Sequence, residues 1–119
     1  MVEETFELAL LFDYYGDLLT QKQKTCFDLY YNQDFSLAEI AQEVGISRQG
    51  VHDSLTRAEA ALRNMEAKTG CVARERAMEQ ALSVIRDAAR QLLVQPEAVA
   101  LAQRILSTAD SLKEDEHGI

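Results

Sequence analysis

The amino-acid sequence predicts an all-α protein of about six helices, in which a helix-turn-helix bundle is followed by a C-terminal helical hairpin. Apolar residues recur at spacings of three and four along most of the chain, which is the period of an amphipathic helix. The 119 residues include one proline and five glycines, and 47% of them are apolar. This composition is typical of a folded chain rather than a disordered one.

A first helix is predicted from about Thr5 to Leu19. Six residues at helical spacing fit a core-facing stripe: Leu8, Leu11, Phe12, Tyr15, Leu18 and Leu19. A second apolar row at spacing four consists of Phe6, Leu10 and Tyr14. A helix with two apolar rows needs two partners, so the second row either packs within the chain or forms a dimer interface.

A second helix begins after Thr20, which has Gln23 three residues later, as in a capping box. The stretch from Ser36 to Arg57 then predicts a helix-turn-helix. Ser36 and Glu39 have the spacing of another capping box at the start of a short helix. That helix carries the apolar stripe Leu37, Ile40, Ala41 and Val44.

Gly45 is placed to end the short helix, because the residue after a helix often takes a positive φ. Ile46 can fill the corner, and Ser47 can cap the next helix. The buried stripe of this next helix is Val51, Leu55, Ala58 and Leu62. Two helices joined by a short turn that contains glycine form the helix-turn-helix motif.

The remaining chain predicts a helical hairpin. Gly70 is a natural stop for the fourth helix. A fifth helix is expected from about Arg74, and Pro96 suits the first turn of a sixth that runs antiparallel to it. We therefore expect a helix-turn-helix domain at residues 1–70, a hairpin at residues 71–112 and a frayed tail at residues 113–119.

Several functional classes are not indicated. No apolar stretch approaches the ~18 residues of a membrane span, and the acidic start of the chain lacks the basic beginning of a signal peptide. We expect a cytoplasmic protein without membrane insertion. Cys26 and Cys71 stand far apart, and His52 and His117 are isolated, so neither a metal site nor a disulfide is predicted. In the absence of phosphate-binding and hydrolase motifs we expect neither an enzyme nor a cofactor.

The outward side of the second motif helix carries the candidates for DNA contact. With Val51 facing the core, Gln49, Asp53 and Thr56 lie opposite, at ~100° per residue. The predicted DNA-contacting set is Ser47, Arg48, Gln49, His52, Asp53, Thr56, Arg57 and Lys22. Gln49 suits adenine N6 and N7, and Arg48 suits a guanine or a phosphate. His52 can reach a base or a sugar, whereas Arg57 and Lys22 suit phosphates.

The charge of the chain argues against DNA. The net charge is −8, and residues 1–70 carry −6 of it, from six basic and twelve acidic residues. Neutralising phosphates supplies most non-specific affinity for DNA, so this contribution must be weak here unless the few cations cluster. Asp53 would repel phosphates unless it accepts from a cytosine N4 amine or pairs with Arg57 at i+4. For each candidate residue the alternative is an ordinary solvated helix surface, and DNA contact is favoured most for Arg48 and Gln49.

With these residues in view, the sequence resembles the YlxM family of small bacterial helix-turn-helix proteins. The matching stretches are LLFDYYGDLLTQKQ from Leu10 to Gln23 and LYYNQDFSLAEIAQEVGISRQGVHDSLTRAEAAL from Leu29 to Leu62, with the later helices in looser form. It is also similar to region 4, the promoter-reading domain, of bacterial sigma factors, whose equivalent of the helix beginning at Ser47–Arg48 enters the major groove. The resemblance implies an all-α, DNA-binding-like protein with a link to the signal recognition particle pathway.

Two functions follow as alternatives. The first is a DNA-binding regulator that reads duplex DNA with Arg48 and Gln49. The second is an acidic interaction module that binds basic components of the signal recognition particle pathway without specific DNA binding. A homodimer, through the row Phe6, Leu10 and Tyr14 or through the hairpin, would set two recognition helices on half-sites ~34 Å apart.

Overall fold

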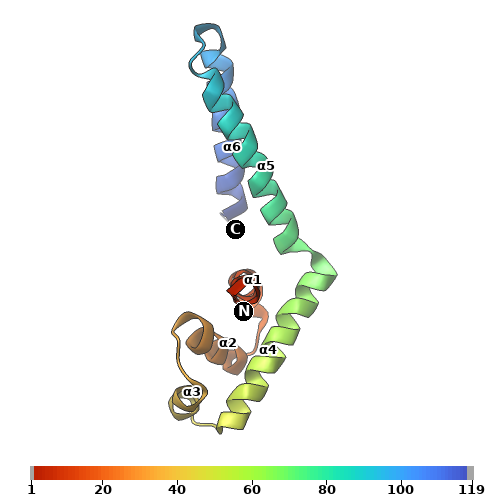
Figure 1. The fold of residues 1–119 in the computed structure, drawn as a ribbon. Coiled ribbons are helices and arrows are strands. Elements are labelled where there is room, and N and C mark those ends of the chain that lie inside the picture. Colours follow the sequence, from red (N-terminus) through yellow and green to blue (C-terminus); the bar gives the residue numbers. More distant parts are fainter. Residues whose placement is uncertain (1, 118–119) are drawn as a thin grey trace. The chain divides into compact units, whose positions relative to one another are not determined.

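The computed structural model describes residues 2–117, with side chains described for residues 3–112. In this part of the chain there are six α-helices and no β-strand (Figure 1). The predicted all-α class is therefore confirmed. The chain divides into two compact units, residues 1–72 and residues 73–119, and each is described by itself.

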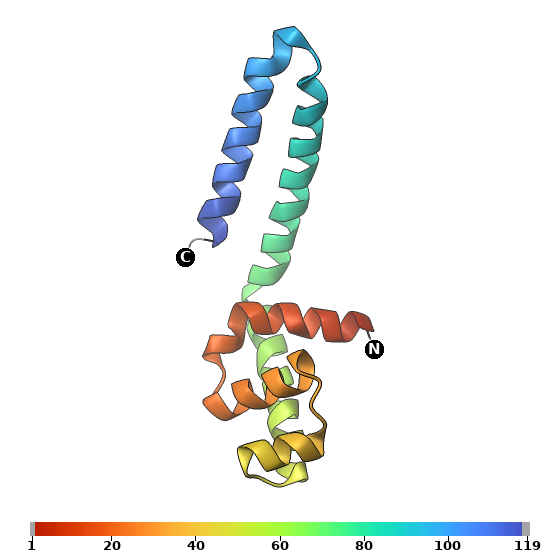
Figure 2. The same cartoon turned by 90° about the vertical axis from the view of Figure 1, so that its left-hand side faces the viewer.

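The first unit is organised around its longest helix. Its elements are α1 (Val2–Tyr15), a 3-10 turn (Gly16–Leu18), α2 (Gln21–Phe27), a π-helical segment (Asp28–Asn32), α3 (Leu37–Val44) and α4 (Arg48–Thr69). Helices α1, α2 and α3 all pack against α4. Figure 2 shows α1 in red running across α4, with α3 near the beginning of α4.

The core of this unit lies between α4 and the three helices on it. The largest fully buried side chains are Phe27, Ile40, Leu62, Val51 and Cys26. Phe27 stacks on Phe12 with ring centroids 4.5 Å apart, and Tyr31 lies 4.4 Å from Phe27 on a tilted plane. Burying a large apolar side chain contributes about 1.5–3 kcal/mol, so this cluster is the main source of stability for the bundle.

The end of α1 differs from the prediction. The helix ends at Tyr15, and Gly16 to Leu18 form one 3-10 turn in place of a continued α-helix. Because a 3-10 turn advances three residues per turn, the helical stripe does not continue through it. Leu18, expected in the core, is 70% exposed, and the prediction for this residue was wrong.

A polar network ties α1 to the end of α4. The Tyr15 hydroxyl donates to Glu66 Oε1 at 2.7 Å and lies 2.5 Å from Thr69 Oγ1. The same Glu66 oxygen accepts from the Val72 amide at 3.0 Å. Burial raises the pKa of the Tyr15 phenol, so the hydroxyl keeps the proton that it donates. Gly70 follows α4 with a φ of 63°, as expected for a helix stop.

The second unit is a helical hairpin. Helix α5 (Cys71–Leu92) and helix α6 (Val99–His117) run side by side in opposite directions, joined through a 3-10 turn at Pro96–Ala98 (Figures 1 and 2). Pro96 stands at the start of that turn, where its missing amide costs no hydrogen bond. The backbone of α6 continues to His117, past Leu112, where the sequence predicted a frayed tail to begin. Residues 118–119 of that tail lie outside the described residues.

Candidate nucleic-acid interface

The corner between α3 and α4 is held by capping residues. Ser36 Oγ accepts from the Glu39 amide at 3.1 Å, and Glu39 Oε1 accepts from the Ser36 amide at 3.0 Å. Gly45 takes the left-handed conformation, with φ 79° and ψ 34°. Ser47 Oγ accepts from the Gly50 amide at 2.9 Å at the start of α4. The predicted capping box, helix stop and N-cap are therefore confirmed.

Gly50 is a residue of this corner that the sequence reasoning missed. A Cβ at this position would lie 3.1 Å from Ser47 Oγ and 3.5 Å from Ile46 Cδ1. The distance to Ile46 is ordinary van der Waals contact, whereas the distance to Ser47 Oγ is short, so a side chain at Gly50 would press on the capping hydroxyl. The spacing alone gave no signal, because the same position after Ser36 and after Thr20 holds Glu39 and Gln23.

Beyond the corner, α4 buries one side and exposes the other. Val51, Ser54, Leu55 and Ala58 are buried, and Ile40 of α3 is buried with them. The Ser54 hydroxyl has no hydrogen-bond partner among the described residues. An unpaired buried hydroxyl costs about 1–3 kcal/mol, so this residue lowers the stability of the first unit.

The opposite side of α4 presents most of the predicted set. Every one of these side chains is exposed: Arg48, Gln49, His52, Asp53, Thr56 and Arg57, together with the cap residue Ser47. Lys22 is also exposed, but it belongs to the first turn of α2. Seven of the eight predicted residues thus come from one helix start, and Lys22 comes from another element.

Hydrogen bonds connect the exposed residues to one another. Gln49 Nε2 donates to Asp53 Oδ1 at 3.0 Å, and His52 Nδ1 lies 3.8 Å from the same oxygen. Thr56 Oγ1 donates to the His52 carbonyl at 3.0 Å. Among the contacts of the described residues, Asp53 therefore pairs toward Gln49 at i−4 and not toward Arg57 at i+4, the partner considered in the sequence.

The basic residues of the first unit fall into two groups. Lys24 pairs with Asp17, and Arg63 pairs with Glu4 at 3.1 Å. Within the described part of this unit, no ion pair involves Arg48, Arg57, Lys22 or Lys68. Two guanidinium groups on the exposed side of α4 thus remain available to an anionic ligand, with one carboxylate between them.

The fold and this helix start define a helix-turn-helix protein. The chain belongs to the UPF0122 family, whose model, described as "Putative helix-turn-helix protein, YlxM / p13 like", matches residues 2–101. The predicted resemblance to the YlxM family is thereby confirmed. The match runs through α5 into α6, so it includes most of the hairpin as well as the motif.

Similar proteins come from several bacteria. A UPF0122 protein of Acetivibrio thermocellus is 45% identical over 87 residues, which cover 72% of this chain and 74% of the relative. A UPF0122 protein of Halalkalibacterium halodurans is 37% identical over 105 residues, 88% of this chain and 96% of the relative. One from Thermoanaerobacter sp. is 37% identical over 115 residues, 94% and 98% of the two chains. Within the described residues, no helix combines the length and apolar character needed to cross a membrane.

Proposed function

We propose that this protein is a DNA-binding helix-turn-helix regulator that meets duplex DNA with the exposed side of the first turns of α4. The observation that carries the proposal is the uncovered group of polar side chains on that side, from Arg48 to Arg57. In helix-turn-helix proteins the N-terminal residues of the second helix contact base edges in the major groove. Ser47, bonded to the Gly50 amide, holds this helix start in place.

Within the proposed interface the residues divide into base readers and phosphate binders. Gln49 offers a carboxamide to adenine, and Arg48 offers a guanidinium to a guanine or a phosphate. His52 and Thr56 would contact a base or the sugar, and Arg57 and Lys22 would bind phosphates. Asp53 orients Gln49, because its carboxylate accepts a hydrogen bond from Gln49 Nε2 and so restricts that side chain.

The proposal expects weak electrostatic attraction. The chain has a net charge of −8, so few cations can neutralise phosphates. Arg48, Arg57 and Lys22 would make three phosphate contacts. The logarithm of the binding constant should then fall with the logarithm of the salt concentration at a slope of roughly −2.7. That slope is small for a DNA-binding protein, and it requires measurements at low salt.

Fluorescence anisotropy with a random-sequence duplex, at about 50 mM and about 200 mM salt, tests this function. Arg48→Ala and Gln49→Ala should weaken binding, and Arg48→Ala should also flatten the salt dependence. Lys68→Ala, which removes an exposed cation from the last turn of α4, is the matched control and should bind like the wild-type chain. A folded protein that binds no duplex at low salt would refute the proposal.

A second candidate function is favoured by the charge of the chain and by Asp53 within the exposed group. An acidic surface attracts basic partners over a distance. The partners implied by the family resemblance are components of the signal recognition particle pathway. Pull-downs from lysate, followed by titration with purified particle proteins and RNA, address this alternative. Recovery of nucleic acid without any protein would count against it.

We also propose a cytoplasmic homodimer without catalytic activity. The row Phe6, Leu10 and Tyr14 supplies one surface for it: Phe6 is 58% exposed, Tyr14 is 51% exposed and Leu10 is half-buried. Exposed acidic residues Glu3, Glu7 and Asp13 lie on the same helix. Sedimentation of the full chain at micromolar concentration tests this part of the proposal, and a monomer would remove it.

A further inference from the structure

The hairpin buries very little of its own surface. In its described part the buried side chains are Leu82 and Ala89 of α5 and Ala102 and Ala109 of α6. Each pair is seven residues apart, which is the heptad spacing of helices that pack in bundles. One leucine and three alanines form a small core for two helices of 22 and 19 residues. Units of this size usually need a further partner for stability.

A second heptad row lies beside the buried one on each helix. On α5 it consists of Met78, Ile85 and Leu92, and on α6 of Ile105 and Leu112. These five side chains are between 39% and 50% exposed. In a helical bundle the two apolar positions of a heptad both face partner helices. Here only one of the two rows is covered.

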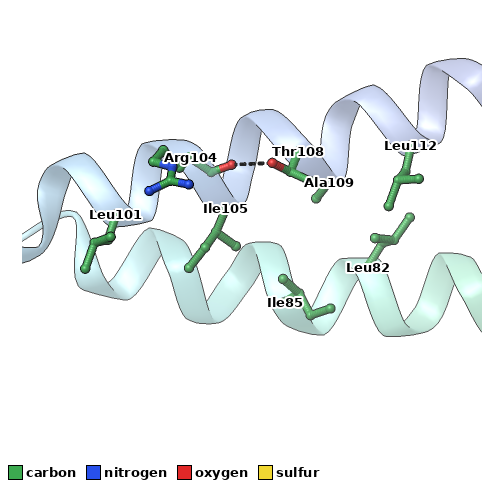
Figure 3. A pocket seen from close by; sticks show the side chains of 8 residues that line it. All are labelled: Leu82, Ile85, Leu101, Arg104, Ile105, Thr108, Ala109 and Leu112. Carbon is green, nitrogen blue, oxygen red and sulfur yellow. Dashed lines mark hydrogen bonds between the residues drawn. The ribbon is translucent and has the colours of Figure 1, made fainter.

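The open rows border a groove between α5 and α6. The groove has a volume of about 510 Å³ and is lined by Leu82, Ile85, Leu101, Arg104, Ile105, Thr108, Ala109 and Leu112. Figure 3 shows Leu82 and Leu112 reaching toward each other from the two helices, with Ile85 and Ile105 further along. The Thr108 hydroxyl donates to the Arg104 carbonyl within α6, so it makes no demand on a partner.

A charged contact between the two helices lies outside this groove. Arg86 Nη1 of α5 lies 3.6 Å from Asp110 Oδ1 of α6, and the Arg86 side chain is only 16% exposed. Neither residue lines the groove. The ion pair between Arg86 and Asp110 is therefore separate from the groove. Arg104 is the charged side chain among the residues that line the groove.

We propose that this open face binds the same face of a second copy of the chain, so that two hairpins form a four-helix bundle. The proposal rests on the homodimer proposed above and gives it an interface other than the row on α1. In a two-fold dimer each patch meets itself, so carboxylates within the patch would face their own copies. Helices α5 and α6 carry exposed carboxylates such as Asp87 and Asp110, but the groove lining contains none, and its one charged side chain is Arg104. On α1, the exposed carboxylates Glu3, Glu7 and Asp13 share the helix with the apolar row.

The spacing and the area both suit a second hairpin. Heptad rows pack on helices with the same repeat, and a copy supplies two of them with equal length. At roughly 60 Å² of apolar area for a half-exposed side chain, the five residues of the open rows and Leu101 expose roughly 350 Å². A patch of this size lies within the range of the largest apolar patch on an ordinary monomer, which is often functional. It can form the centre of an interface of about 800 Å² per partner, which is the usual size for stable dimers.

Sedimentation equilibrium of the full chain without DNA tests the interface. The wild-type chain should be dimeric at micromolar concentration. The double variant Ile85→Ala, Ile105→Ala should raise the dimer dissociation constant roughly 100-fold, and alanine keeps the helices intact because of its high helix propensity. Val84→Ala is the matched control: Val84 is exposed on α5 but does not line the groove, so its removal should leave the dimer unchanged.

A variant that is expected to tighten the dimer complements the alanine variants, because a folding defect cannot explain tighter association. Thr108→Val replaces a hydroxyl at the groove by a methyl group of similar shape and should tighten the dimer. Circular dichroism checks that each variant retains its helices. A wild-type chain that stays monomeric at ~100 μM, far above a micromolar dissociation constant, overturns the inference. A dimer weakened by Phe6→Ala but not by the double variant also overturns it and places the interface on α1. DNA titrations are separate, so failure of one proposal leaves the other standing.

Discussion

Gln49 donates a hydrogen bond from Nε2 to Oδ1 of Asp53, 3.0 Å away, on the exposed side of α4. The acceptor is a carboxylate, and it lies within the group of residues proposed to face DNA. The pair therefore has two opposing effects on a nucleic-acid ligand. It orders the side chain suited to adenine, and it adds a negative charge close to phosphates.

Asp53→Asn should separate these two effects. Asparagine keeps an oxygen that can accept from Gln49 but removes the charge, so affinity for duplex DNA at low salt should rise several-fold. Asp13→Asn, on the exposed surface of α1, changes the net charge equally and is the control. Anisotropy titrations measure both. Equal gains for the two variants would show that only the net charge matters and that α4 is not the interface.

Two serines of the motif should respond to alanine with opposite signs. Ser54 Oγ is buried without a partner among the described residues, so Ser54→Ala should raise the free energy of unfolding by about 1 kcal/mol. Ser47 Oγ caps α4, so Ser47→Ala should lower it by about 1 kcal/mol. Urea denaturation measures both changes. A destabilised Ser54→Ala variant would mean that the hydroxyl has a partner in solution, such as a bound water.

Substitutions at Gly45 measure the free-energy cost of a positive φ in the turn between α3 and α4. Its φ is 79°, and a Cβ built there would meet nothing within 4 Å, so a side chain adds strain without a clash. Gly45→Ala should therefore destabilise the protein by about 1–2 kcal/mol. Gly45→Asn should cost less, because asparagine visits this conformation more readily. Equal losses for the two variants would contradict a purely conformational origin.

The capping box of α3 should make stability depend on pH. The hydrogen bond from the Ser36 amide lowers the pKa of the Glu39 carboxyl below its usual range. A carboxyl with a lowered folded-state pKa stabilises the fold above its unfolded pKa, and this contribution disappears as the pH falls through the folded pKa. Glu39→Gln can keep the capping bond without a titrating group. Unfolding curves of the wild-type chain should thus lose stability in acid more steeply than those of Glu39→Gln.

Local rules of helix ends explain what the sequence could predict. Thr20, Ser36, Gly45, Ser47 and Gly70 each act on backbone atoms within a few residues, so their roles follow from spacing alone. The exposed side of α4 followed in the same way from the helical period once Val51 was taken as buried.

What the sequence could not predict depends on packing and on rotamers. Leu18 fits a helical stripe, but the 3-10 turn after Tyr15 places it in solvent. Asp53 could pair with Gln49 at i−4 or with Arg57 at i+4, and spacing does not distinguish these. The role of Gly50 depends on how closely Ser47 Oγ approaches this position, which only the folded corner defines.

The Tyr15 network sets a practical limit for dissecting the chain. Glu66 Oε1 accepts from both the Tyr15 hydroxyl and the Val72 amide, although Val72 follows the glycine that ends α4. A fragment cut at Gly70 would remove one of these two donors. The shortest piece able to retain the complete anchor ends no earlier than Val72, and biophysical work on an isolated motif should begin from that boundary.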